Sequence, residues 1–321
     1  MSTTSVKARE ITTTPRKSDL LFRGVLTSMS MSSLVILTLI GGFLAFRGFE
    51  SFKTQGLHFI TQWDWSAAQD TSMKDSFGLG AMIIGTLVIA AVALTIGVPI
   101  SVLTALYLTF YAPNSLRKFL IGVIDLMASF PSILYGLWGF IVLMPIAEVW
   151  AKYINKYLGW IPVFHVPSPA FARSPFIAGL VLSIMIVPIV TSVSREIFSQ
   201  TPLDRIQAAY ALGSHRWGMV RAVAFPYARG GIVGGAMLGL GRAMGETVAV
   251  YTVLNIVYQV NWHVLLGAGG NVASMILLKF GEAGPLEVKA LMAAGLILFL
   301  VTLAVNSLAN FIVAKTGKGG R

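Results

Sequence analysis

Long apolar segments recur along this chain, and they limit its fold more than any other feature. An α-helix rises about 1.5 Å per residue, so roughly 20 apolar residues cross the hydrocarbon of a bilayer. Hydrophobic residues make up 55% of the chain and charged residues only 12%, far from a typical soluble composition. The sequence therefore predicts an all-α integral membrane protein with six transmembrane helices, at Leu20–Phe46, Leu79–Phe110, Phe119–Ala147, Phe176–Val193, Gly230–Tyr258 and Leu286–Ala314.

Polar segments divide the chain around these helices. Residues 1–18 are rich in Ser, Thr, Lys and Arg and predict a disordered cytoplasmic tail. Residues 19–78 hold the first transmembrane helix and an extracytoplasmic loop, 79–314 form the membrane core, and 315–321 form a second cytoplasmic tail. With the N-terminus inside, fifteen Lys and Arg residues lie on the cytoplasmic side and eight on the other. The positive-inside rule therefore favours cytoplasmic termini.

Composition and missing motifs exclude several functions. The net charge of +11 comes mostly from short loops, where it sets membrane orientation and does not indicate nucleic-acid binding. The chain has no Cys, and its four His residues form no HExxH pattern, so no metal site is predicted. It also lacks a GxxxxGK[ST] phosphate-binding loop, so it is not itself an ATPase. We expect a protein that is not an enzyme and has no cofactor of its own.

Arg242 is the one basic residue near the middle of a long apolar segment. A charge there costs roughly 2.5–3.5 kcal/mol on insertion scales, so it needs a partner and should not face lipid. Glu246 follows four residues later, on the same face of a continuous helix, and is predicted to pair with Arg242. A guanidinium can also donate paired hydrogen bonds to an oxyanion without losing its charge. A structural ion pair and an anion ligand both remain open, and Glu246 could yield Arg242 to the anion.

The segment 195–229 is the one long stretch of soluble character between two predicted spans. Thr201 is predicted to cap a helix that ends at Gly213, and Ser214 to cap a second helix that Pro226 breaks. Two short helices joined at a glycine make a compact projection on the cytoplasmic face. Spacing alone does not distinguish a docking element from an inert connecting loop.

The same segment contains QAAYALGSHRWGMVRAVAFP, which resembles the EAA loop of ABC importer permeases. That resemblance implies a coupling helix that docks on a nucleotide-binding subunit, at positions Gln207, Ala208, Ala209, Gly213 and Pro226. Gln207 stands where the family usually has Glu, so a hydrogen bond would replace any ion pair with the ATPase.

Two further segments, MASFPSILYGLWGF and GGAMLGLGRAMGETVAV, resemble the PstC branch of the phosphate-specific permeases. The resemblance implies a type I ABC importer permease fold in a bacterial inner membrane, with ATP and Mg bound by partner subunits. The implied partners are a PstA-like second permease, two ATP-binding subunits, an extracytoplasmic phosphate-binding protein and inorganic phosphate. The implied substrate-binding residues are Arg242, Glu246, Ser129 and Ser132.

Alternatives remain for several of these residues. Ser129 and Ser132 flank Pro131 and could instead belong to a local kink whose backbone is satisfied internally. Glycines repeat every four residues in the fifth predicted span and favour close packing against a partner subunit. Molybdate, sulfate or phosphonate could replace phosphate as the substrate. A proton-coupled carrier that uses Glu246 and Asp125 is a different class, and it would have no need of an EAA loop.

Overall fold

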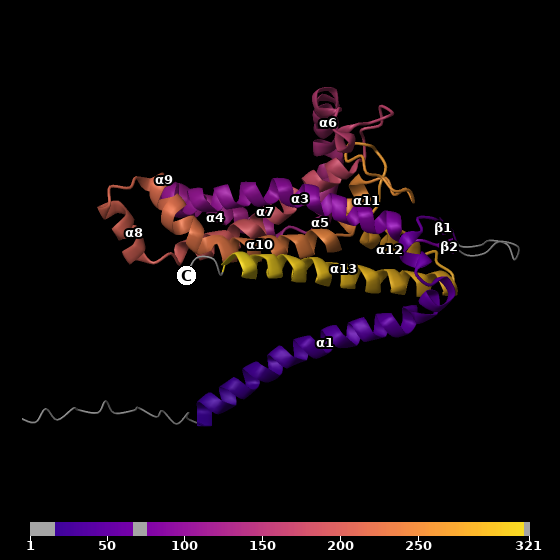
Figure 1. Cartoon of the computed structure of the whole chain (residues 1–321), viewed down its shortest axis with the longest axis horizontal. Helices are drawn as coiled ribbons and strands as arrows, with labels where there is room; N and C mark the ends of the chain where they lie inside the picture. Colours follow the sequence, from indigo (N-terminus) through magenta and orange to yellow (C-terminus); the bar gives the residue numbers. More distant parts are fainter. Residues whose placement is uncertain (1–16, 67–75, 318–321) are drawn as a thin grey trace, which may run out of the picture.

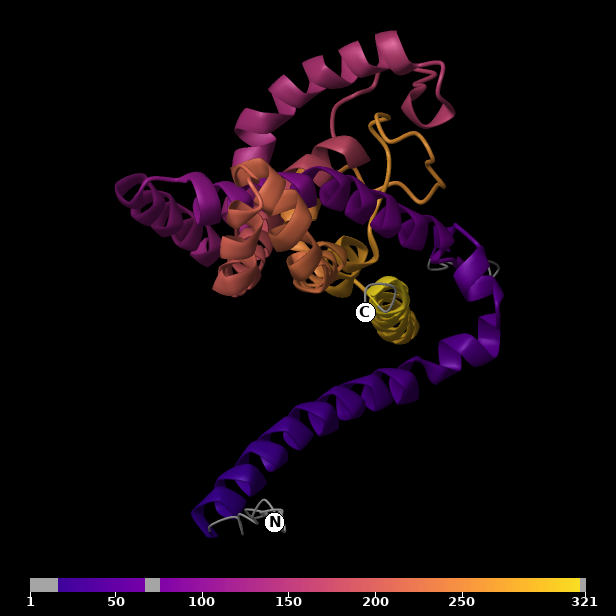
Figure 2. The same cartoon turned by 60° about the vertical axis from the view of Figure 1, so that its left-hand side comes forward.

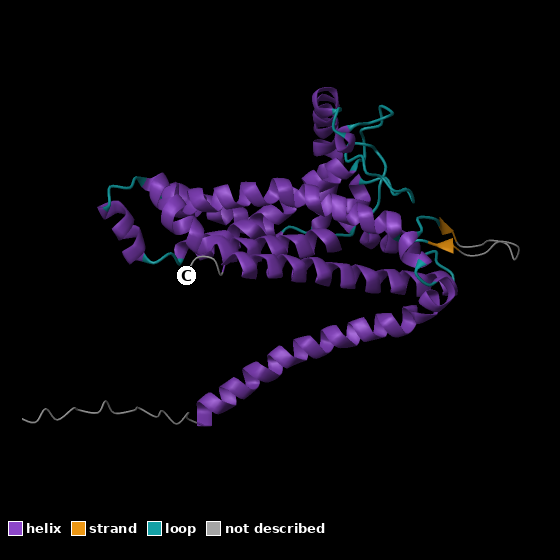
Figure 3. Cartoon of the chain, in the orientation of Figure 1, coloured by secondary structure: helices purple, strands orange, loops and turns teal. Residues whose placement is uncertain are grey.

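A computed structural model describes residues 17–66 and 76–317 of the chain. The described residues are mostly helical, and their only strands are β1 (Trp65–Ser66) and β2 (Ser76–Phe77) (Figure 3). The two strands pair antiparallel with Trp65 opposite Phe77. This agrees with the predicted all-α class.

Four long helices run side by side and form the body of the molecule (Figures 1 and 2). They are α3 (Gly80–Leu106), α7 (Pro175–Ser199), α10 (Phe225–Gly245) and α13 (Pro285–Gly317). Helix α7 lies at the centre, and its apolar side chains form the main core with those of α3, α10 and α11 (Val248–Val253).

The C-terminal part of helix α1 (Lys17–Gln55) packs along α13, whereas the N-terminal part of α1 diverges from the bundle (Figures 1 and 2). The most apolar part of α1 has no buried residue. Such a helix is stable only in an apolar solvent or against another protein, so α1 is suited to a lipid bilayer.

Within the described residues, five helical stretches are long and apolar enough to cross a membrane. The prediction of six continuous spans is therefore corrected. The segment predicted at Gly230–Tyr258 is not one helix, because α10 ends at Gly245 and Glu246 has an extended backbone. The five stretches are Lys17–Gln55, Gly80–Tyr111, Ser132–Leu158, Pro175–Ser199 and Pro285–Phe311.

The third predicted span, Phe119–Ala147, is also divided. Proline disfavours helical backbone at the preceding residue, and Phe130, which precedes Pro131, is extended at φ −68° and ψ 134°. The apolar stretch therefore restarts after Pro131 and continues to Leu158, through residues expected to lie at the membrane interface. Its parts are α4 (Asn114–Ser129), α5 (Ser132–Trp138), η2 (Gly139–Leu143) and α6 (Met144–Leu158).

Three π-helical turns occur in the described chain, and each ends two residues before a proline. They are η1 (Tyr107–Tyr111) before Pro113, η2 before Pro145 and η4 (Val220–Ala224) before Pro226. Proline has no N–H and collides with the carbonyl four residues earlier in an α-helix, and a wider turn relieves this conflict. Pro226 consequently does not break its helix, contrary to the prediction.

The predicted tails are helical where they adjoin the long helices. Helix α1 already includes Lys17 and Ser18, the last two residues of the first tail, and α13 extends to Gly317; the rest of each tail lies outside the described residues. The other short helices are α2 (His58–Thr61), η3 (Pro162–Phe164), α8 (Leu203–Ala211), α9 (Arg216–Met219) and α12 (Val272–Phe280).

Candidate functional site

Arg242 lies in the last turn of α10, immediately before the helix breaks. A cation at this end complements the negative end of the helix dipole. The side chain is exposed on the isolated chain, and no described carboxylate lies within 4.0 Å of its guanidinium. Its charge acts electrostatically on the Tyr135 hydroxyl, which is itself bonded to the Met127 carbonyl. The site is thus a guanidinium without an ion-pair partner among the described residues, with its hydrogen-bonding capacity available.

The predicted ion pair between Arg242 and Glu246 is not formed. The prediction assumed a continuous helix, but Glu246 follows the last residue of α10 with φ −71° and ψ 126°. Its side chain turns toward the next helix, where Oε1 accepts a hydrogen bond of 3.2 Å from the Ala249 amide. Glu246 is 8% exposed, so its carboxylate shapes the buried start of α11.

A second helix break lies between α4 and α5. Tyr135 on α5 is buried, and its hydroxyl donates a 2.6 Å hydrogen bond to the Met127 carbonyl on α4. Helix α5 also packs closely on α11. Gly136 allows this approach, since a Cβ at that position would overlap the Thr252 side chain. Tyr135 was not predicted as a site residue, although it follows a proline within an apolar run.

Ser129 and Ser132 lie on either side of the break between α4 and α5. The Ser129 hydroxyl donates to the Leu126 carbonyl of its own helix at 2.7 Å. Ser132 is half-buried at the first residue of α5. Both residues therefore flank the break that the Tyr135 hydroxyl bridges, and their contact with substrate stays a prediction.

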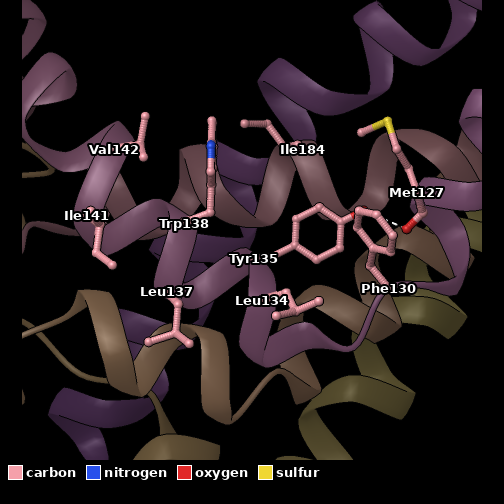
Figure 4. A pocket seen from close by; sticks show the side chains of 9 residues that line it. All are labelled: Met127, Phe130, Leu134, Tyr135, Leu137, Trp138, Ile141, Val142 and Ile184. Carbon is pink, nitrogen blue, oxygen red and sulfur yellow. Dashed lines mark hydrogen bonds between the residues drawn. The ribbon is translucent and has the colours of Figure 1, made fainter.

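A cavity of about 570 Å³ opens beside Tyr135 (Figure 4). Its lining is apolar and comes mainly from α4, α5 and η2, with Ile184 of α7 on the far side. In Figure 4 the Tyr135 ring points toward Phe130 and Met127, and its hydroxyl is already bonded to the Met127 carbonyl. An apolar cavity does not solvate an anion, so the candidate anion site is at Arg242 and not here.

Four of the five residues assigned to ATPase coupling, all but Pro226, belong to α8 and the turn after it, and α8 projects at one end of the bundle (Figure 1). Gln207, Ala208 and Ala209 lie on α8, with the first two exposed. The helix starts at Leu203, one residue later than predicted, because the Thr201 hydroxyl bonds the Phe198 carbonyl and does not cap α8. Leu212, at the end of this helix, is 89% exposed, which suits a surface that a partner covers.

Gly213 ends α8, as predicted. Its φ of +80° lies in the left-handed region, and the Ser214 amide bonds back to the Ala209 carbonyl at 3.1 Å. This is a Schellman-type helix end, which strongly prefers glycine.

Pro226 belongs to a helix that runs without interruption from α9 through η4 into α10. Arg242 is consequently near one end of a single helical element, Arg216–Gly245, and the other end adjoins the Gly213 turn that follows α8. A movement of the Arg216 end can reach Arg242 along one continuous helix.

Gly231, Gly235 and Gly239 of α10 face this chain's own α7 and not a partner subunit. A Cβ at Gly231 would overlap Ile197, and Cβ atoms at Gly235 and Gly239 would approach Val193 to 3.2 Å and Val190 to 3.0 Å. The expectation of a partner interface on this face was therefore wrong, because the small face is already occupied within the chain.

The chain is similar to curated proteins along almost its whole length. It is 38% identical over 307 residues to "Phosphate transport system permease protein PstC 2" of Mycobacterium bovis, which covers 95% of this chain and 94% of the relative. It is 37% identical over 306 residues to "Phosphate transport system permease protein PstC" of Pasteurella multocida, covering 94% and 93%.

The fold is also found among solved structures. A chain from the bacterial alginate ABC transporter, solved in complex with its alginate pentasaccharide-bound periplasmic protein, aligns with a TM-score of 0.59 at 16% identity. The alignment covers 94% of this chain and 98% of that one. Residues 97–318 match the model of a family described as "Binding-protein-dependent transport system inner membrane component", and together with the full-length relatives this shows that the chain belongs to that family.

Proposed function

We propose that this chain is the permease subunit of an ATP-driven importer of inorganic phosphate. Its full-length relatives are phosphate permeases of the PstC branch. The structural observation that supports an anionic substrate is Arg242, a permanently charged group at a helix break without a described carboxylate partner. Phosphate supplies the paired oxygen acceptors that a guanidinium favours.

In this function α10 and α11 together make the sixth crossing of the membrane. Helix α10 lies among α3, α7 and α13, which are membrane-spanning by length and composition. Transporters often place their substrate where a membrane helix is broken, and both Arg242 and Tyr135 lie at such breaks. The start of α1, the end of α13 and the α8 projection are at the same end (Figure 1), and the positive-inside count makes that end cytoplasmic.

Energy comes from partner subunits, because the sequence has no phosphate-binding loop of its own. Two ATP-binding subunits, with their ATP and Mg, dock on the α8 projection at Gln207, Ala208 and Ala209. A PstA-like permease completes the path, and an extracytoplasmic phosphate-binding protein delivers the substrate. Closure of the ATPase pair pushes the projection, and the continuous helix Arg216–Gly245 transmits this push to Arg242.

Phosphate uptake by Arg242→Lys and Arg242→Ala complexes tests the proposal. Losing charged hydrogen bonds of roughly 1.5–3 kcal/mol corresponds to a fall of about 10- to 150-fold. Co-purification of the ATPase subunit controls for assembly. Normal uptake by either assembled variant contradicts the anion role, whereas failed assembly would show a structural role.

Competition experiments test the choice of anion, since a guanidinium also binds other tetrahedral oxyanions. We expect phosphate, and not molybdate, sulfate or phosphonate, to compete with labelled phosphate at equal concentration. Orthovanadate should stop uptake by the assembled complex. Uptake that resists vanadate would instead favour a proton-coupled carrier.

A further inference from the structure

The break between α10 and α11 is held by two hydrogen bonds from another part of the chain. Helix ends leave carbonyls unpaired, and membrane hydrocarbon offers no replacement donors. The Glu246 carbonyl accepts a 2.9 Å hydrogen bond from Asn271 Nδ2. The Thr247 carbonyl, which already accepts the Tyr251 amide at 3.0 Å, accepts a second hydrogen bond of 2.8 Å from Ser274 Oγ. Both donors come from the first turn of α12, far along the chain.

Asn271 also holds α12 itself. Its Oδ1 accepts a 2.8 Å hydrogen bond from the Ser274 amide, which caps the helix. Asn271 is 1% exposed and Ser274 is fully buried. One amide side chain therefore joins the start of α12 to the break through its two different ends.

The first turn of α12 is anchored on α3. The Val272 amide donates a 3.1 Å hydrogen bond to Thr86 Oγ1, and the Thr86 hydroxyl donates in turn to the Met82 carbonyl at 2.7 Å. The Gly270 main chain packs directly against Gly85, where a Cβ would overlap the Gly270 carbonyl. The two hydrogen bonds to the break thus tie it to a rigid helix of the bundle.

Arg242 lies within one turn of the residues so held. The direction in which α10 ends determines where the guanidinium points, and a displacement of about 1 Å can reduce a rate 100-fold. Asn271 and Ser274 reach Arg242 only through the main chain of Glu246 and Thr247.

We propose that Asn271 and Ser274 are positioning residues, which hold the α10–α11 break and thereby aim Arg242 at the transported anion. This inference rests on the proposed function, because it assumes that Arg242 binds phosphate. The hydrogen bonds from Asn271 and Ser274 to the break set the geometry of that contact, and neither side chain touches the substrate.

Asn271→Asp separates the two roles of the side chain. Aspartate keeps the acceptor that caps α12 but loses the donor to the Glu246 carbonyl. Asn261→Asp is the matched control, because Asn261 Nδ2 likewise donates to loop carbonyls, those of Leu266 and Ala268, away from the break. Ser274→Ala removes the second hydrogen bond, with Ser183→Ala as its control, since the buried Ser183 hydroxyl bonds only within α7 among the described residues.

The readout is phosphate moved per ATP hydrolysed, in proteoliposomes that contain the assembled complex and saturating phosphate-loaded binding protein. We expect Asn271→Asp and Ser274→Ala to lower this ratio about tenfold or more, while both control variants keep it. A merely structural role would lower the yield or melting temperature of the complex and leave the ratio unchanged, and that result overturns the inference. Should Asn271→Asp fail to assemble, Ser274→Ala decides alone.

The double variant Arg242→Lys with Asn271→Asp distinguishes the inference from the proposed function. Residues that act as a unit are non-additive, so the double variant should be no worse than Arg242→Lys alone. Additive losses overturn the positioning role. If Arg242→Lys by itself leaves the ratio normal, the proposed anion contact fails; if it lowers the ratio and Asn271→Asp does not, only the positioning role fails.

Discussion

The Tyr135 hydroxyl donates a 2.6 Å hydrogen bond to the Met127 carbonyl and so bridges the break between α4 and α5. The bond spans the extended residues Phe130 and Pro131, where the missing N–H of proline interrupts the helical hydrogen bonds. The Met127 carbonyl thus accepts both the Tyr135 hydroxyl and, at 3.2 Å, the Phe130 amide.

Tyr135→Phe removes the bridge while it keeps the ring. The Met127 carbonyl keeps the Phe130 amide as a donor at 3.2 Å, so the variant loses one hydrogen bond worth about 0.5–1.5 kcal/mol. We expect a lower unfolding temperature of the purified chain and slower phosphate uptake. Tyr153→Phe is the control, because Tyr153 is 57% exposed. Equal stability of the two variants would refute the bridging role of Tyr135.

Gly231→Ala tests whether the small face of α10 packs within the chain. The new Cβ would overlap Ile197 of α7, and overpacking of this kind costs about 1–3 kcal/mol. Gly234→Ala on the same helix is the matched control, since nothing lies within 4 Å of its Cβ position. In the isolated chain, Gly231→Ala should have a lower unfolding temperature than Gly234→Ala. A defect that occurs only in the assembled complex would show that this face contacts a partner subunit.

Gly213→Ala tests the turn of the coupling projection. A left-handed conformation costs a residue with a Cβ roughly 1–2 kcal/mol, so the turn should distort and the ATPase subunit should co-purify less. Asn tolerates this conformation, and Gly213→Asn should restore part of the binding. Gly230→Ala serves as a control in a helix with open space. Full ATPase binding by Gly213→Ala would show that the conformation of this turn is not needed for coupling.

Tyr258, in the loop between α11 and α12, makes the stability of the folded chain depend on pH. Burial, and secondarily the charge of Glu287, raise the pKa of Tyr258 from 10.0 to about 12. Below pH 10 both folded and unfolded chains keep the proton. Between pH 10 and 12 the unfolded chain loses it and the folded chain does not, so stability falls as pH rises.

Tyr258→Phe should remove this loss. Its buried hydroxyl has no hydrogen-bond partner among the described residues, so at pH 8 the variant should be at least as stable as the original chain. At pH 11 it should be more stable by about 1 kcal/mol. Thermal unfolding at both pH values measures this, with exposed Tyr251→Phe as control. A constant difference between pH 8 and 11 would exclude the titration.

Much of the candidate site follows from local rules. The glycine end of α8 could be predicted because Gly213 is a residue that tolerates the left-handed backbone of a helix end. Pro226 was predicted to break its helix, but the helix continues, because the π-helical turn before Pro226 accommodates the missing hydrogen bond. Whether a proline breaks or merely widens a helix depends on the packing of its neighbours.

The sequence by itself determined that this chain is a helical membrane protein with an isolated arginine in an apolar segment. Hydropathy and composition are properties of the residues alone, so no tertiary contact was needed for that conclusion. Only the tertiary structure decided that Glu246 does not pair with Arg242. The helix between them ends at Gly245, and the Glu246 carbonyl at the break takes its donor from Asn271, which is distant in sequence, so no local pattern contains that information.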